Sequence, residues 1–242
     1  MKPFLLLATR THDVAADAEY RAVARHAGLE LSDLKRIRVE AGPLPEINLD
    51  DYSGVFLGGS QFSVTDTNKT EQQKRTENDI TALIAEVVAA DKPFFGMCYG
   101  IGAVTSYLGG LVDHIYSEPV GATTITINEK GKTDPITVGV PTKFDAFVGH
   151  KEACNTAPNG ATVLAEGQAC PVQMYKVKDN IYVTQFHPEL DTDDLIERMH
   201  IYQNAGYFDP SELDSLVDMA RNSQVSGIQH QILKNFTNRY II

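Results

Sequence analysis

A short apolar run that ends in the pattern Gly-x-Cys-x-Gly constrains this sequence more than any other feature. Phe94-Phe95-Gly96-Met97 leads into Cys98, and Tyr99-Gly100 opens a stretch of helical character. The pattern predicts a buried strand, a sharp turn that carries the cysteine, and a helix. Flanking glycines let neighbouring backbone approach the turn, and a helix N-terminus favours a thiolate. We therefore expect Cys98 to be a nucleophile, with an ordinary buried thiol as the alternative.

A second motif, Gln185-Phe186-His187-Pro188-Glu189, follows the β-like run 181–184. A cysteine nucleophile needs a general base within hydrogen-bond reach, and that base needs an acid to orient it. His187 and Glu189 supply both, with a proline of fixed φ between them. Because the carboxyl ends of parallel strands meet at one edge of a sheet, Cys98 and His187 are expected to meet there.

A third motif is the glycine pair in Leu57-Gly58-Gly59-Ser60, which follows an apolar run. Acyl transfer through a tetrahedral intermediate needs backbone N–H groups aimed at the oxyanion. A Gly-Gly turn can present such a group without a side chain in the way. A plain turn after a strand is the alternative interpretation.

Strands and helices alternate along the first part of the chain, which predicts an α/β fold. We expect strands at 4–8, 37–39, 54–57 and 94–97, a helix at 15–27 that ends at Gly28, and a second long helix before Pro93. The texture then becomes β-rich, with expected strands at 123–127, 136–138, 144–148, 161–165, 172–177 and 181–186. Asp191 can cap a helix that runs to about residue 204, and further helices are expected near 211–220 and 228–240. The predicted organisation is one domain over 1–204 and a helical extension over 205–242 that packs on it.

Charge and composition exclude several classes of function. The chain has 242 residues and a formal net charge of −11, so phosphate-rich nucleic acids and anionic membranes would repel it. Its longest early apolar run, residues 4–8, is too short to span a bilayer or to form a signal-peptide core. The three cysteines are sparse and form no C-x-x-C pair, which argues against disulfides and a cysteine-based zinc site. We expect a cytoplasmic protein.

Together these motifs resemble those of the class I glutamine amidotransferases, and most of all the amidotransferase domain associated with GMP synthases. The resemblance covers about residues 4–200 and implies a flavodoxin-like, open, mostly parallel sheet flanked by helices, with extra β-strands and no metal or cofactor. It implies that Cys98 attacks the side-chain amide of L-glutamine, that ammonia leaves, and that the thioester is hydrolysed to glutamate. His187 would be the base and Glu189 its orienter. The remaining implied residues, which would bind the oxyanion or the substrate, are Gly58, Gly59, Tyr99 and His150.

One departure from the family pattern affects the substrate. Gly102 stands where the family usually carries a glutamine that helps to hold the substrate, so a γ-glutamyl compound other than free glutamine is a second candidate. His150 either lines the pocket or lies on the surface. No ATP-binding motif accompanies the amidotransferase motifs, so the ammonia would pass to a separate synthase subunit, or the chain would act alone as a γ-glutamyl peptide or amide hydrolase.

Two interpretations from other classes remain open at this stage. One is a non-catalytic regulatory subunit of the same fold, against which the complete Cys-His-Glu set argues. The other is a different cysteine-elbow α/β protein, such as a chaperone or glyoxalase, whose motif order the late Gln-Phe-His-Pro-Glu segment does not fit. For the segment after residue 204, packing on the domain and contacts in a homo-oligomer are both open roles.

Overall fold

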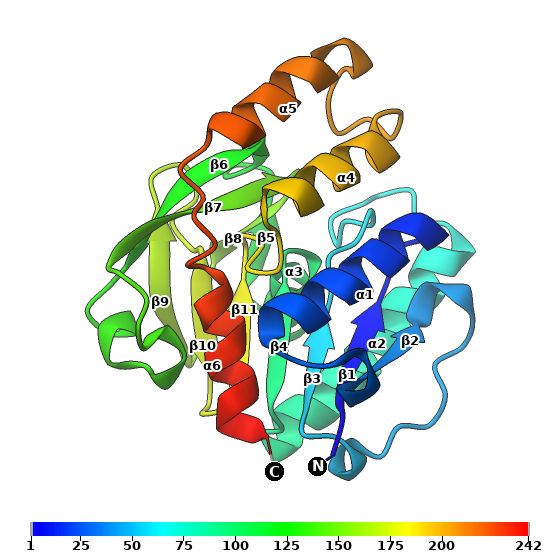
Figure 1. Ribbon diagram of the computed structural model, residues 1–242. Coiled ribbons are helices and arrows are strands. Elements are labelled where there is room, and N and C mark those ends of the chain that lie inside the picture. The colour runs from blue at the N-terminus through cyan, green and yellow to red at the C-terminus, as the bar shows by residue number, and fades with distance from the viewer. Residues whose placement is uncertain (1, 242) are drawn as a thin grey trace.

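Nine strands form one sheet in the computed structural model, which describes residues 2–241 (Figure 1). Five neighbouring strands are parallel, in the order β2 (Leu34–Arg38), β1 (Phe4–Ala8), β3 (Gly54–Leu57), β4 (Phe94–Met97) and β11 (Ile181–Thr184). Four antiparallel strands extend this sheet, in the order β10 (Met174–Val177), β9 (Ala161–Gly167), β6 (Glu118–Ile127) and β7 (Lys143–His150). A separate pair consists of β5 (Leu111–Asp113) and β8 (Ala153–Thr156). The parallel half is the open α/β sheet that the alternating sequence predicts.

Helices cover both faces of the parallel half. Helices α1 (Asp13–Ala27) and α6 (His230–Tyr240) pack on one face, and α2 (Glu71–Ala90) and α3 (Tyr99–Tyr107) on the other (Figure 1). Helix α1 ends where Gly28 adopts a left-handed conformation, with φ of 72°. Helices α4 (Thr192–Tyr202) and α5 (Leu213–Asn222) pack against each other, and Phe147 of β7 lies in the same apolar cluster. Asp191 caps α4 through a capping box with Asp194, as its position before the helix predicts.

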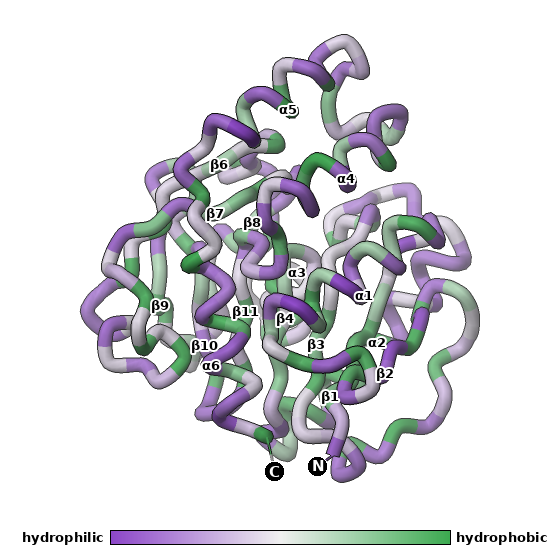
Figure 2. Tube along the Cα trace, viewed as in Figure 1, coloured by the Kyte–Doolittle hydropathy of each residue, from purple (hydrophilic) through white to green (hydrophobic). Residues whose placement is uncertain are grey.

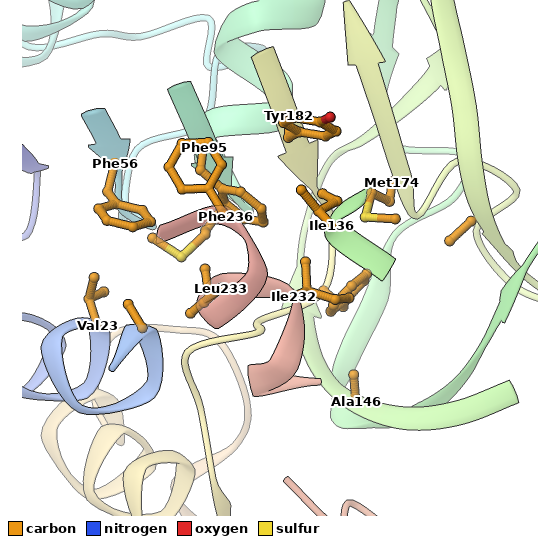
Figure 3. Packing of buried hydrophobic residues seen from close by; sticks show 14 of the residues in the cluster. Val23, Phe56, Phe95, Ile136, Ala146, Met174, Tyr182, Ile232, Leu233 and Phe236 are labelled. Carbon is orange, nitrogen blue, oxygen red and sulfur yellow. The ribbon is translucent and has the colours of Figure 1, made fainter. Parts of the chain in front are cut away.

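The largest apolar cluster lies between the sheet and the pair α1 and α6 (Figure 3). The ring of Phe236 on α6 is fully buried and lies 5.4 Å from the Phe56 ring and 5.3 Å from the Phe95 ring, measured between centroids. Hydrophobic residues concentrate along the central strands, whereas hydrophobic and polar residues alternate along the outer helices (Figure 2). The segment after residue 204 therefore contributes side chains to the same core as the first strands.

The fold class and the order of elements agree with the sequence analysis, with local differences. The run 136–138, expected to be a strand, begins in a 3-10 turn over Pro135–Thr137, because Pro135 fixes φ and the Asp134 side chain accepts a hydrogen bond from the Ile136 N–H at 3.2 Å. Strands β5 and β8 were not expected; both are short. No helix within residues 2–241 is both long and apolar enough to cross a membrane.

Candidate active site

Cys98 lies on a strained turn between β4 and α3. Its φ of 52° and ψ of −92° lie outside the usual regions for a residue with a side chain. The Cys98 N–H donates to the Thr184 carbonyl oxygen at 2.8 Å, which attaches the turn to β11. A Cβ atom at Gly96 would lie 3.0 Å from the Gly100 backbone, so this strand-to-helix packing needs a glycine at that position. The Gly-x-Cys-x-Gly pattern thus forms the tight elbow that it predicts.

His187 and Glu189 follow β11, the strand next to β4. Met97 and Thr184 are register partners, so the residues beyond both strand ends meet at one edge of the sheet. The Nδ1 atom of His187 lies 2.7 Å from Oε1 of Glu189, and both side chains are buried. Cys98 and His187 line the same cavity. The structure therefore brings the three predicted catalytic residues together.

The charge state of this group follows from its contacts. Burial by itself lowers the pKa of His187, but interactions with Glu189 and Cys98 outweigh it and raise that pKa to about 9. Burial likewise raises the pKa of Glu189, but His187 and then Arg198 bring it down to about 2. Arg198 Nη1 lies 3.3 Å from Glu189 Oε1. At neutral pH the pair is an imidazolium held by a carboxylate, which can donate a proton from the imidazole ring.

The glycine pair lies beside this group, but its amide has an unexpected acceptor. The Gly59 N–H donates to Oε1 of Glu19 at 3.1 Å, and Arg10 Nε donates to the same oxygen at 2.8 Å. Glu19 is fully buried and Arg10 is 4 % exposed. A Cβ atom at Gly58 would overlap the Glu19 carboxylate. In this structure the Gly59 N–H is therefore directed at a protein carboxylate, whereas the Tyr99 N–H belongs to the first turn of α3, where amides lack helical partners.

His150, at the end of β7, is buried. Its Nε2 lies 3.1 Å from Oε2 of Glu118, and its Nδ1 lies 2.9 Å from the Glu152 carbonyl oxygen. Its side chain lines a cavity that also contains Cys98 and Tyr99, as one of the two interpretations proposed. A Cβ atom at Gly102 would lie 3.3 Å from Oε1 of Glu152, so a larger side chain at that position would meet this carboxylate.

Two clusters within residues 2–241 have three ligand-type side chains close enough to hold a metal ion. In one, His150 and Glu118 are joined by the hydrogen bond described above, and burial raises the pKa of the Cys170 thiol to about 12. The members of the other are His26, Asp191 and Asp194, which bond to one another and to Arg25. The ligand atoms of both clusters thus have protein partners, and neither cluster contains Cys98.

Four residues that shape the site lie outside the predicted motifs: Arg10, Glu19, Arg198 and Tyr207. Arg10 could have been found, because it stands two residues after β1 and the carboxyl end of that strand lies at the edge that carries Cys98. Arg198 lies on α4, and its sequence position does not distinguish it from the solvated charged residues that helices usually carry. Tyr207 lies in the loop between α4 and α5, and its hydroxyl donates to the Ser60 carbonyl oxygen at 3.4 Å.

These features define an α/β protein with a cysteine elbow and a buried His-Glu pair. The family model for "Glutamine amidotransferase class-I" matches residues 14–201. The chain therefore belongs to the class I glutamine amidotransferase family.

Relatives and solved structures agree with this membership. A GMP synthase [glutamine-hydrolyzing] from Streptomyces avermitilis is 30% identical over 149 residues, which are 61% of this chain and 26% of that protein. The enzyme of that name from Thermosipho africanus is 29% identical over 115 residues, 47% of this chain and 22% of that protein. This chain thus spans about a quarter of the length of these relatives.

The fold itself matches solved structures over nearly its whole length. A glutamine amidotransferase from Thermotoga maritima superposes with a TM-score of 0.76 at 18% identity, covering 99% of this chain and 98% of that one. A putative GMP synthase subunit from Thermoplasma acidophilum gives a TM-score of 0.61 at 19% identity, covering 85% of this chain and 97% of that one.

Proposed function

We propose that this chain hydrolyses the side-chain amide of glutamine through a Cys98 thioester and releases glutamate and ammonia. The observation that carries the proposal is the placement of Cys98, on a strained elbow, in one cavity with the buried His187–Glu189 pair. Membership of the class I glutamine amidotransferase family supports the same reaction.

Each residue of the site has a separate role in this reaction. Cys98 Sγ, having given its proton to His187, attacks the amide carbon, and the oxyanion that forms accepts from the Tyr99 N–H in the first turn of α3. His187 gives its proton to the departing nitrogen while Glu189 stabilises the imidazolium. Water then attacks the thioester, His187 takes the proton, and the thiolate leaves. Gly59 is the second oxyanion donor. To take part, its N–H must release the Glu19 carboxylate and donate to the oxyanion instead.

The ammonia would pass to a separate acceptor enzyme. The relatives named above are glutamine-hydrolysing GMP synthases, and this chain matches about a quarter of their length. The putative GMP synthase subunit from Thermoplasma acidophilum has the same fold as most of this chain. These likenesses support a role as the ammonia-producing subunit of a synthase.

Glutamate release from L-glutamine by the purified protein tests the proposal. Wild type is expected to release glutamate and Cys98→Ala to release none, whereas Cys170→Ala, which alters a buried cysteine outside the triad, is the matched control. A glutamine-like electrophile should label Cys98 alone, because burial raises the pKa of Cys154 to about 11 and of Cys170 to about 12. Full activity in Cys98→Ala would refute the proposal.

A further inference from the structure

Two cavities meet at Cys98. We call the first the glutamyl-side cavity; its lining includes Tyr99, Phe62, His150 and Gln185. The second, which we call the leaving-group cavity, contains His187 and extends along α4 and the loop after it. Cys98 and Tyr207 line both, so Cys98 stands at their junction.

The position of His187 tells which part of a substrate each cavity receives. The general acid must lie beside the nitrogen that it protonates, and His187 lines the second cavity but not the first. The Tyr99 amide, which faces the developing oxyanion in the proposed reaction, belongs to a residue of the first. A γ-glutamyl group bound in the glutamyl-side cavity therefore directs its departing amine into the leaving-group cavity.

The walls of the leaving-group cavity are largely apolar, which ammonia does not require. Six side chains without a polar N–H or O–H group contribute to them: Val120, Val148, Leu190, Leu195, Met199 and Phe208. Three of these, Leu195, Met199 and Phe208, come from α4 and the following loop. Burial of an apolar side chain of leucine size typically strengthens binding tenfold or more. This cavity is thus suited to an amine that carries an apolar side chain.

One buried cation with a free donor lies in the same cavity. Arg10 uses Nε for Glu19 and Nη1 for the Tyr202 hydroxyl at 3.4 Å, and its Nη2 makes no hydrogen bond within residues 2–241. That nitrogen lies 2.6 Å from the point where a Cβ atom on Gly59 would stand, beside the glycine turn. A guanidinium N–H is a strong partner for a carboxylate. An amino-acid leaving group would supply both the apolar side chain and this carboxylate.

We propose that the site hydrolyses γ-glutamyl peptides whose second residue is apolar, in preference to glutamine. The proposal rests on the proposed function, because the same Cys98 chemistry is used. Cys98 Sγ, having given its proton to His187, forms a bond to the carbonyl carbon of the γ-glutamyl amide, the C–N bond breaks, and the proton on His187 moves to the departing nitrogen. Water then forms the new C–O bond as the C–S bond breaks, and its proton returns to His187. One peptide and one water give glutamate and one apolar amino acid.

Four substrates separate the contribution of the apolar side chain from that of the carboxylate of the leaving group. γ-Glu-Leu has both groups, γ-Glu-Gly lacks the side chain, γ-glutamyl-isopentylamide lacks only the carboxylate, and glutamine lacks both. We expect kcat/KM for γ-Glu-Leu to exceed that for γ-Glu-Gly and for glutamine at least tenfold, with the isopentylamide between. Glutamine turnover with γ-Glu-Leu no better than γ-Glu-Gly would overturn this inference and leave the proposed function standing. Failure to cleave any of the four would overturn both.

Two matched phenylalanine variants test which of the two cavities receives the apolar side chain. Phe208 lines only the leaving-group cavity and Phe62 only the glutamyl-side cavity, and both are half-buried. Phe208→Ala is expected to lower the ratio of kcat/KM for γ-Glu-Leu to that for glutamine at least fivefold. Phe62→Ala is expected to change both values in parallel and leave the ratio within twofold. A ratio that falls equally in the two variants would contradict the assignment of the cavities.

Binding to Cys98→Ala protein provides a measurement without turnover. Titration calorimetry is expected to show γ-Glu-Leu bound at least tenfold more tightly than glutamine. Equal affinities, with glutamine turnover by wild type, would mean that the leaving-group cavity receives no side chain and would overturn this inference.

Discussion

The Nδ1 atom of His187 lies 2.7 Å from Oε1 of Glu189, with both side chains buried at the end of β11. This contact fixes the orientation of the ring and, together with Cys98, raises the pKa of His187 to about 9 against the opposing effect of burial. The imidazolium is therefore the resting form at neutral pH.

Glu189→Gln should remove this effect. We expect the pKa of His187 to fall toward its ordinary value and kcat to drop at least about 100-fold, since loss of the orienting acid in a comparable serine triad costs about 10⁴. Proton NMR titration of the imidazole and glutamate release measure the two effects. Asp193→Asn, which removes an exposed acid of α4, is the control and should alter neither.

Gly58→Ala should disturb the buried carboxylate beside the glycine turn. The new methyl group would overlap Glu19, which Arg10 and the Gly59 N–H hold in place. We expect a loss of about 2 kcal/mol in the free energy of unfolding, in the range for overpacking, together with weaker activity. Urea unfolding measures the first. Gly42→Ala is the matched control because nothing lies within 4 Å of its Cβ position, and equal losses in both variants would contradict the explanation.

His230 should make stability depend on pH. Burial, reinforced by the nearby His26, lowers the pKa of His230 to about 4, although the Pro188 carbonyl oxygen accepts from its Nδ1 at 2.7 Å. The unfolded chain takes up a proton below pH 6.5 that the folded chain refuses, so stability is lost as the pH falls from about 6.5 toward 4. This one residue should lower the free energy of unfolding by about 2 kcal/mol between pH 7 and pH 5.

Urea unfolding at both pH values measures this loss. His230→Gln, which cannot titrate, should show a correspondingly shallower pH dependence. Identical slopes in wild type and variant would show that folding does not lower the pKa of His230.

Phe236→Ala should reveal how much the last helix contributes to the core. The ring is fully buried against Phe56 and Phe95, so its removal leaves a cavity that costs about 3–5 kcal/mol in the free energy of unfolding. Chemical denaturation measures the cost. Val138→Ala, at a position 67% exposed, should change stability by less than about 0.5 kcal/mol. A small effect of Phe236→Ala would contradict the importance of this ring for the core.

Local patterns were enough to predict the parallel half of the sheet and the meeting of Cys98 with His187. Continuous apolar runs indicate strands buried on both faces, and parallel strands bring their carboxyl ends to one edge. The nucleophile and its partners were therefore accessible from motifs that each span five residues.

Contacts between distant segments were not accessible in this way. Nothing in the sequence near Gly59 indicates that its amide meets Glu19, which lies in the middle of α1 and resembles an ordinary helix residue. The apolar wall from α4 and the 203–209 loop also depends on how the helix packs over β7, which helical periodicity does not specify. Pro135 is the opposite case. This proline is a local constraint, and the run 136–138 begins in a 3-10 turn instead of the expected strand.

The backbone conformation of Cys98 implies that the protein is less stable than its own sequence could make it. A residue with a side chain at φ 52° and ψ −92° costs about 1–3 kcal/mol, which glycine would largely avoid. Cys98→Gly should therefore be more stable than Cys98→Ala by about 1 kcal/mol, although both lack the thiol. Stability alone would favour glycine at this elbow, so the strain at Cys98 is explained by the chemistry of its thiol and not by folding.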